Sequence, residues 1–311
     1  MREPHERSLS GKRIGIFGKG GSGKSTVTVL LARAFRRAGY EVAVLDADST
    51  NAGLPEALGL EVSPEPLVEH FGGMVFSGGI VTCPVDDPTP LEVPDIFLES
   101  LPEGLARKSP DGIWLLVAGK MGQRGPGAGC DGPLAKIVRD VRIHNSGEEP
   151  VTLVDFKAGF EDTARGVIIG LDWALVVVDP TLAAVQMATD LKDTIEELER
   201  GALPATAHLS QSALIGLARD LYRKARIKGV FCLLNKVPDA AAESILRTEL
   251  GKEGIDPIGG IATTPSIAAS WLTGAPIDSI AAELELLDVV RRFETAESTR
   301  SQQAIGVVRA G

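Results

Sequence analysis

Aromatic side chains are scarce in this sequence: nine Phe, three Trp and two Tyr make up 5% of its 311 residues. Hydrophobic residues still make up 44%, so the sequence predicts a sizeable core built mainly of aliphatic side chains. Only three cysteines occur, at positions 83, 130 and 232, which do not make a disulfide framework. The four histidines show no spacing typical of metal ligands.

The chain also has few positive charges: its 42 Asp and Glu outnumber its 32 Lys and Arg, which gives a net charge of −10. Such a balance disfavours electrostatic binding to nucleic acid or to anionic membranes. No run of about 18 apolar residues occurs, the first ten residues lack the apolar core of a signal peptide, and residues 300–311 show no basic amphipathic helix. We therefore expect a cytoplasmic protein with no nucleic-acid partner and no stable membrane association.

The most informative stretch that is present covers residues 18–26, G-K-G-G-S-G-K-S-T, and fits the phosphate-loop pattern G-x-x-x-x-G-K-[ST]. A strand-like run precedes it and a helical pattern follows it, as the pattern requires. Its glycines let backbone N–H groups converge on phosphate oxygens, Lys24 would reach the β- and γ-phosphates, and the Ser25 hydroxyl would hold Mg²⁺. The predicted nucleotide-binding residues of this loop are Gly18, Lys19, Gly20, Gly21, Ser22, Gly23, Lys24, Ser25 and Thr26.

Apolar β-rich runs alternate with helical patterns along the chain, which predicts an α/β fold: a parallel sheet with helices on both faces. We expect strands at residues 13–17, 41–45, 113–118, 151–155, 173–178, 229–234 and 255–262. We expect helices at residues 23–38, 133–142, 160–171, 181–200, 212–225, 240–251 and 277–293.

The predicted organisation is one P-loop ATPase domain over residues 12–295, between a flexible N-terminus (1–11) and a flexible C-terminal tail (296–311). Residues 60–111 are rich in proline and poorly periodic. We expect them to form an insertion packed on the edge of the same domain.

Carboxylates follow two of the predicted strands, at the edge of the sheet where ligands bind in such folds. Asp46 and Asp48 end the second strand, and Asp155 ends a hydrophobic run in the Walker B pattern. Beside a phosphate loop, carboxylates hold Mg²⁺ or orient an attacking water; local capping of a turn is the alternative for Asp46 and Asp48. The predicted Mg²⁺ site comprises Ser25, Asp46, Asp48 and Asp155.

Lys19, directly after the first glycine, is a lysine that an ordinary phosphate loop does not need. With it, residues 19–25 resemble the deviant Walker A family, which includes the nitrogenase iron protein, the cell-division and plasmid-partition ATPases and the nickel-insertion ATPases of carbon monoxide dehydrogenase. The resemblance implies an ATP-sandwich homodimer in which Lys19 reaches the nucleotide of the other subunit. It further implies that Asp48 activates water, and that Asp46 and Asp155 lie near the metal. The catalytic residues that it implies are Lys19, Lys24, Asp48 and Asp155.

A strand that ends in Asn235 and Lys236 supplies the predicted base site. In the resembling family this asparagine bonds the adenine edge. A guanine-reading N-K-x-D motif would need aspartate at position 238, where this sequence has Pro238, so ATP is favoured over GTP. Pro265, after the last predicted strand, is expected to wall the base pocket; the acidic residue that usually follows it in the family is absent.

The stretch at residues 122–132 is dense in glycine and contains Cys130. In the iron protein and the nickel-insertion ATPases the matching loop supplies a metal-ligating cysteine at the dimer interface, so the resemblance implies that role for Cys130. The second cysteine of the nickel-insertion family is replaced by Gly132, and residues 155–165 contain none. Two thiolates per dimer are too few for a four-cysteine iron–sulfur cluster. They suit Zn²⁺ or Ni²⁺ with Asp131 or water completing the shell, and the alternative is a lone interface thiol.

The other two cysteines and Lys157 have less specific contexts. Cys83 has no partner in sequence, and Cys232 lies in an apolar strand, where we expect it to be buried and inert. Lys157 follows the Walker B aspartate, in the stretch that resembles switch II. It either contacts phosphate, pairs with a switch carboxylate or faces solvent, and solvent exposure is the favoured interpretation.

The resemblance to the nickel-insertion ATPases covers about residues 11–293. It implies a Mg-ATP-hydrolysing dimeric switch that assists metallocentre assembly in a client metalloenzyme. One alternative is an ATP-gated electron donor like the nitrogenase iron protein, which would need four cluster cysteines per dimer. A second is a partition-type positioning ATPase, which the acidic charge disfavours, and a third is a small-molecule kinase with its substrate site in residues 60–111.

Overall fold

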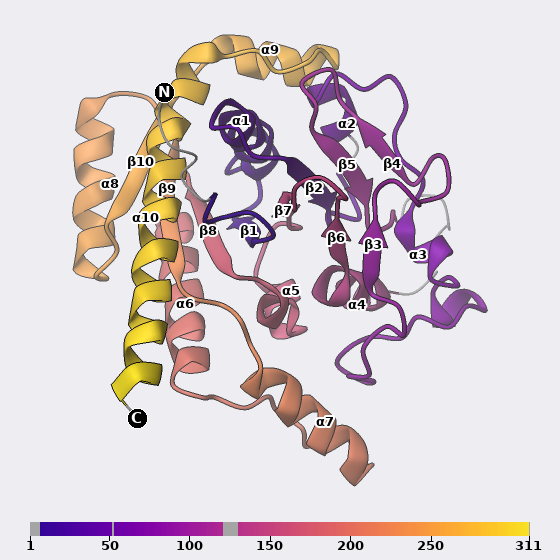
Figure 1. The fold of residues 1–311 in the computed structure, drawn as a ribbon. Helices are drawn as coiled ribbons and strands as arrows, with labels where there is room; N and C mark the ends of the chain where they lie inside the picture. Colours follow the sequence, from indigo (N-terminus) through magenta and orange to yellow (C-terminus); the bar gives the residue numbers. More distant parts are fainter. Residues whose placement is uncertain (1–6, 52, 121–129, 311) are drawn as a thin grey trace.

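The computed structural model describes residues 7–51, 53–120 and 130–310. Within them, one sheet of eight strands forms the centre of the molecule in the order β10-β9-β8-β1-β7-β2-β5-β4 (Figure 1). Its neighbouring strands pair in parallel except β4, which is antiparallel to β5 at one edge. The strands are β1 (Arg13–Gly18), β2 (Val42–Asp46), β4 (Ala106–Lys108), β5 (Trp114–Val117), β7 (Val151–Asp155), β8 (Trp173–Val178), β9 (Val230–Val237) and β10 (Pro257–Ala262). The α/β prediction with a mainly parallel sheet is confirmed.

Helices cover both faces of this sheet. The helices α1 (Lys24–Arg37) and α10 (Ile280–Ala310) pack together on one face, and α4 (Gly132–Asp140) and α6 (Leu182–Glu199) lie on the other. The helix α8 (Ala240–Lys252) packs beside α6, and α7 (Ser212–Arg223) projects from the body of the molecule (Figure 1). The remaining elements are α2 (Leu54–Ala57), α3 (Leu67–His70), α5 (Glu161–Ala164), α9 (Pro265–Thr273), the 3₁₀ turns Val75–Ser77 and Val167–Gly170, and the small parallel pair β3 (Asp95–Phe97) and β6 (Arg142–His144).

The alternation of side chains along the strands explains the two hydrophobic layers. In β8, Trp173, Leu175 and Val177 pack into the layer of α1 and α10, while the alternate residues pack into the layer of α4 and α6. All six residues of β8 are buried, as expected for a parallel strand covered on both faces. Most of these side chains are aliphatic, which fits the low aromatic content.

Near the site, one predicted helix differs from the structure and one observed helix was not predicted. The helix expected at residues 160–171 is instead α5 followed by a 3₁₀ turn, because Gly166 adopts a left-handed conformation with φ 78° between them. A Cβ at Gly166 would also approach the Tyr222 hydroxyl to 2.9 Å. The helix α9 was not predicted, although Pro265 at its first turn is a recognisable helix-start signal.

The described parts of the two segments expected to be flexible contain a helix and a buried side chain. The last helix continues past residue 293 to Ala310, so the segment expected as a flexible tail is helical. Residues 1–6 of the expected flexible N-terminus lie outside the described residues, but Leu9 is fully buried. Among the described side chains of these segments, Leu9 packs into the layer of α1 and α10, and Glu297 bonds Trp173 and Lys228. No helix in the described part of the chain is long and apolar enough to span a bilayer.

The expected insertion at residues 60–111 belongs to the same core as the rest of the domain. Its side chains Leu67, Val68, Met74 and Ile96 are buried in one cluster with the inner face of α4. The strand β4 extends the central sheet, and β3 pairs with β6, which follows α4. The insertion is therefore packed against α4 and also paired with β6, the strand that follows α4.

The C-terminal helix is anchored by one buried carboxylate. Glu297 is 3% exposed and accepts hydrogen bonds from Trp173 Nε1 at 2.9 Å and Lys228 Nζ at 2.6 Å. Burial alone would raise the pKa of Glu297, but the hydrogen bonds from Lys228 and Trp173 and the charge of Lys12 hold this pKa below its ordinary value.

We expect Glu297→Ala to lower the free energy of unfolding by about 3 kcal/mol, because it leaves a buried indole N–H and an ammonium without their acceptor. Urea denaturation measures this change. The control is Glu285→Ala, an exposed glutamate of the same helix, which should stay within about 0.5 kcal/mol of the unmodified protein. Equal effects of the two substitutions would contradict the anchoring role.

Candidate functional site

The phosphate loop connects β1 to α1 and has the backbone that its glycines predict. Gly21 and Gly23 have φ of 82° and 92°, in the left-handed region that favours glycine. A Cβ at Gly23 would lie only 2.3 Å from Nδ2 of Asn235. Gly23 caps α1, so the positive end of that helix faces the loop.

Asn235 and Lys236, at the end of β9, hold this loop from the side. Asn235 Nδ2 donates to the carbonyl of Ser22 at 2.7 Å, and Lys236 Nζ donates to the carbonyl of Gly21 at 2.7 Å. Lys236 adopts φ 57°, a left-handed conformation that is unusual outside glycine. The structure thus brings the predicted base-site residues onto the phosphate loop; contact of Asn235 with adenine stays a prediction.

A cavity of about 490 Å³ opens beside the loop, next to Lys24 and Ser25. Its far wall is formed by Ile267, Ala268 and Trp271 of α9, none of which was predicted. Trp271 Nε1 donates to Thr26 Oγ1 at 2.8 Å and fixes α9 over the start of α1. Pro265 begins α9 and is not among the residues that line this cavity, and its contact with a base stays a prediction.

The two lysines of the loop point in different directions. Lys24 is buried and its Nζ lies 3.5 Å from the carbonyl of Lys19. Burial lowers the pKa of Lys24, and the charges of Asp155 and Asp48 partly oppose this shift. Lys19 is half-exposed, with Nζ 3.9 Å from Oδ2 of Asp179 at the end of β8. Within one chain, Lys19 is therefore only loosely held.

Asp46 and Asp155 end the neighbouring strands β2 and β7 and are direct partners in the strand register. Both are buried, at 1% and 0% exposure. Burial raises the pKa of Asp155 to about 7, and the nearby charge of Asp46 adds to the shift. Burial also raises the pKa of Asp46 to about 6, although Lys120 opposes it.

The oxygens of these residues suit Mg²⁺. Asp155 Oδ1 accepts a hydrogen bond from Thr28 Oγ1 at 3.2 Å, whereas its Oδ2 is buried without a hydrogen bond of ordinary geometry. The Ser25 hydroxyl lies near enough to lower the pKa of Asp155. A hard divalent cation prefers such oxygen ligands and would compensate the buried charge. Ser25, Asp46 and Asp155 therefore fit the predicted metal.

Asp48 is engaged differently. Its Oδ1 accepts hydrogen bonds from Thr50 N at 2.9 Å, Thr50 Oγ1 at 2.7 Å and Asn51 N at 3.2 Å, so it caps its own turn. This is the local alternative that the sequence left open.

Two functional residues escaped the sequence reasoning. Asn51 Nδ2 donates to Ser25 Oγ at 2.8 Å and ties the segment after β2 to the phosphate loop. Lys120 Nζ donates to Asp46 Oδ2 at 2.6 Å, to the carbonyl of Asp48 at 2.6 Å and to the carbonyl of Asn51. The position of Lys120 just after β5, at the ligand-binding edge of the sheet, was the signal that could have found it.

The start of α4 is connected to the segments after both β2 and β7. Asp131 accepts a hydrogen bond from Lys157 Nζ at 3.0 Å, pairs with Arg165 at 3.1 Å, and lies 3.4 Å from Ser49 Oγ. The favoured expectation that Lys157 faces solvent is therefore wrong. The hydrogen bond to Asp131 raises the pKa of Lys157 and opposes the smaller effect of burial. Asp131 is occupied by these cations, so its predicted role as a metal ligand would cost two ion pairs.

Cys130 precedes Asp131 and is exposed. Residues 122–129 of the predicted loop lie outside the described residues. The structure brings a second cysteine to this place: a Cβ at Gly132 would lie 2.7 Å from Sγ of Cys83 and 3.3 Å from Sγ of Cys130. Among the residues with described side chains, no group of three or more His, Cys, Asp or Glu is arranged to hold a metal.

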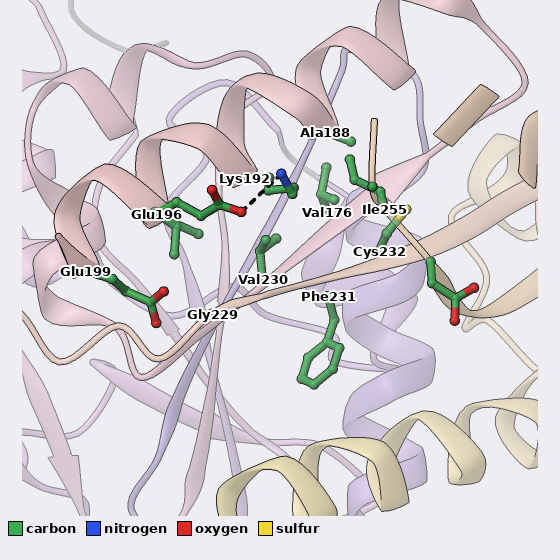
Figure 2. Close-up of a pocket in the computed structure, with 13 residues that line it drawn as sticks. Val176, Ala188, Lys192, Glu196, Glu199, Gly229, Val230, Phe231, Cys232 and Ile255 are labelled. Atoms are coloured by element: carbon green, nitrogen blue, oxygen red, sulfur yellow. Dashed lines mark ion pairs between the residues drawn. The ribbon is translucent and has the colours of Figure 1, made fainter. Parts of the chain in front are cut away.

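The third cysteine has a different environment. Cys232 lines a small cavity of about 210 Å³ between α6, β9 and the segment just before β10, beside the Lys192–Glu196 ion pair (Figure 2). Burial raises the pKa of Cys232 to about 12, so its thiol stays protonated near neutral pH. The prediction of a buried Cys232 is confirmed.

Comparison with known proteins agrees with this geometry. Residues 16–277 match the family described as the CobQ/CobB/MinD/ParA nucleotide binding domain. An uncharacterized ATP-binding protein of Methanocaldococcus jannaschii is 33% identical over 189 residues, which cover 60% of this chain and 74% of the relative. The carbon monoxide dehydrogenase accessory protein CooC of Rhodospirillum rubrum is 28% identical over 187 residues, covering 60% of this chain and 70% of CooC. The solved MinC:MinD complex of Aquifex aeolicus shares the fold, with a TM-score of 0.57 at 20% identity over 91% of this chain and 96% of the solved chain.

The raised pKa values of Asp155 and Asp46 predict how the free energy of unfolding depends on pH. Between about pH 4 and pH 7 the folded protein binds more protons at these sites than the unfolded chain does. The contribution of these two carboxylates to the free energy of unfolding of the nucleotide-free protein should therefore fall as pH rises through this window. We expect Asp155→Asn to flatten this slope and to stabilise the protein at pH 8 by roughly 2–4 kcal/mol, because it removes a buried charge.

Urea denaturation between pH 4 and pH 8 tests this expectation. The exposed Asp193→Asn serves as the matched control and should keep the slope of the unmodified protein. An Asp155→Asn protein with an unchanged slope would show that the carboxylate titrates normally in the folded state.

Proposed function

We propose, from the premise that this chain belongs to the CobQ/CobB/MinD/ParA nucleotide binding domain family, that it is a Mg-ATP-dependent dimeric switch assisting metal insertion into a partner metalloenzyme. The observation that carries this proposal is the position of Asp131. Asp131 is next to the exposed Cys130. It accepts a hydrogen bond from Lys157, which lies two residues after Asp155, and one from Ser49, which directly follows Asp48. A change at the nucleotide site therefore has a short path to the thiol.

The nucleotide would bind in the cavity beside the phosphate loop. The loop N–H groups and Lys24 would hold its phosphates, and the apolar side of α9 would cover its base. Mg²⁺ would take oxygen ligands from Ser25 and, directly or through water, from Asp155 and Asp46. When bound, the metal would neutralise phosphate charge during transfer.

Hydrolysis would require the segment after β2 to move. Asp48 would leave its own turn to orient the attacking water, and Asn51 would release Ser25. Lys120, which holds Asp46 and two carbonyls of this segment, would act as the restraint that keeps it in place beforehand. Such ordering and release of loops is a common basis of nucleotide switches.

Dimerisation would complete the site. Lys19 has one ion pair, at 3.9 Å, and is half-exposed, so little is lost when it turns away. We place it on the γ-phosphate bound by the other subunit. The two Cys130 thiols, one from each chain, would then lie at the shared interface and carry the metal cargo. A carbon monoxide dehydrogenase accessory protein among the relatives supports a metalloenzyme as the client.

We expect Lys24→Ala to lower the rate of ATP hydrolysis at least about 100-fold, because it removes a cation from the transferring phosphate. We expect Lys19→Ala to keep ATP binding but to lose ATP-induced dimers in analytical ultracentrifugation. The control, Lys252→Ala on α8, removes an exposed lysine and should behave like the unmodified protein. ATP-driven dimers that persist in Lys19→Ala would reject the shared site, and full hydrolysis by Lys24→Ala would reject the phosphate loop as its centre.

A further inference from the structure

The thiols of Cys83 and Cys130 converge on one point, although 46 residues separate them in the sequence. That point is the place that a side chain of residue 132 would occupy. A Cβ there would lie 2.7 Å from Sγ of Cys83 and 3.3 Å from Sγ of Cys130. Residue 132 is glycine, so no side chain separates the two thiols. The described structure thus contains a dithiol that the spacing of the cysteines does not reveal.

The insertion is fastened to α4 on both sides of Cys83. Lys136 of α4 donates hydrogen bonds to Thr82 Oγ1 and, at 3.2 Å, to Asp87 Oδ2. Asp87 N donates in turn to the carbonyl of Cys83 at 2.9 Å. Lys136 is buried, and burial lowers its pKa while Asp87 opposes the shift. Because α4 begins at Gly132, the same helix fixes both cysteines.

The chemistry of the pair favours a thiophilic cation. Thiolates bind Zn²⁺ and similar ions at about 2.3 Å, so two sulfurs on one ion lie about 4 Å apart, a separation that this convergence can supply. Both sulfurs lie at the first turn of α4, whose positive end favours nearby negative charge. Asp131 is held by Lys157 and Arg165, so among the described residues at this point we assign the two sulfurs as the ligands.

We propose that Cys83 and Cys130 together bind one divalent ion of the Zn²⁺ or Ni²⁺ class, which is shared by two copies of the chain. Each copy contributes two thiolates, and the four complete a tetrahedral shell. The sharing rests on the proposed dimer, because the described residues of one chain offer no third ligand of the usual kind. The exposure of Cys130 leaves the pair accessible to a second copy. Cys83 is thereby assigned as the second ligand that the sequence did not supply.

The test uses the full-length protein, purified reduced and without oxygen, with Co²⁺ as a spectroscopic probe and Zn²⁺ as competitor. We expect thiolate-to-cobalt charge-transfer absorption that saturates at one ion per two chains. Cys83→Ser and Cys130→Ser should each weaken Zn²⁺ binding at least about tenfold. Cys232→Ser, the matched control, should bind as the unmodified protein does. Unchanged binding in Cys83→Ser would overturn the assignment, and saturation at one ion per chain would overturn the sharing.

Gly132→Ala keeps all three thiols but places a methyl group between two of them. We expect it to weaken Zn²⁺ binding while a thiol reagent still counts three cysteines and circular dichroism shows an intact fold. Unchanged Zn²⁺ binding in this variant would contradict the proposed position of the ion. Absence of Co²⁺ uptake by the protein with both thiols reduced would overturn the proposal.

ATP hydrolysis and ATP-induced dimerisation are measured on the same preparations of the unmodified protein. Co²⁺ binding that needs both cysteines in a protein without ATP hydrolysis would reject the proposed function but keep Cys83 as a ligand. ATP hydrolysis and ATP-induced dimers, together with metal binding that needs only Cys130, would keep the proposed function but reject Cys83 as a ligand.

Discussion

The burial of two carboxylates side by side is the constraint on which the rest of the site depends. Asp46 and Asp155 end adjacent central strands, and neither is accessible to bulk water. A pair of this kind is costly unless cations compensate it. Lys24 and Lys120 supply part of that compensation within the chain, and Mg²⁺ is suited to supply the rest. Because the compensation changes when Mg-ATP binds, the segments that carry these groups have a physical reason to move.

Side-chain hydrogen bonds connect this pair to the start of α4, beside Cys130. Lys120 couples Asp46 to the segment after β2, and Asp131 joins that segment to Lys157 after β7. Asp131 also stands at the start of α4, beside Cys130, and the insertion is fastened to the same helix. A small rearrangement at the phosphates therefore acts on a rigid helix rather than on an isolated loop. This arrangement connects the Cys130 thiol to the phosphate-loop site without direct contact between the two.

The sequence predicted those features that depend on neighbouring residues. The phosphate loop, the apolar strands and the strand-end carboxylates are local patterns, and the structure brings Lys24, Ser25, Asp46 and Asp155 together as expected. Contacts between distant segments were not accessible. Lys120 and Asn51 act through groups on other strands, Trp271 belongs to a helix that was missed, and Cys83 reaches Cys130 only because the insertion folds back on α4. Lys157 was misjudged for the same reason, since its partner Asp131 lies 26 residues away.

The central claim is that the nucleotide site controls the environment of Cys130 through Asp131. The most direct measurement is the alkylation rate of Cys130, followed by peptide mass spectrometry, with and without Mg²⁺ and a non-hydrolysable ATP analogue. The account predicts a change of at least about fivefold on nucleotide binding, and a much smaller change in Asp131→Asn. Identical rates with and without nucleotide in the unmodified protein would contradict it.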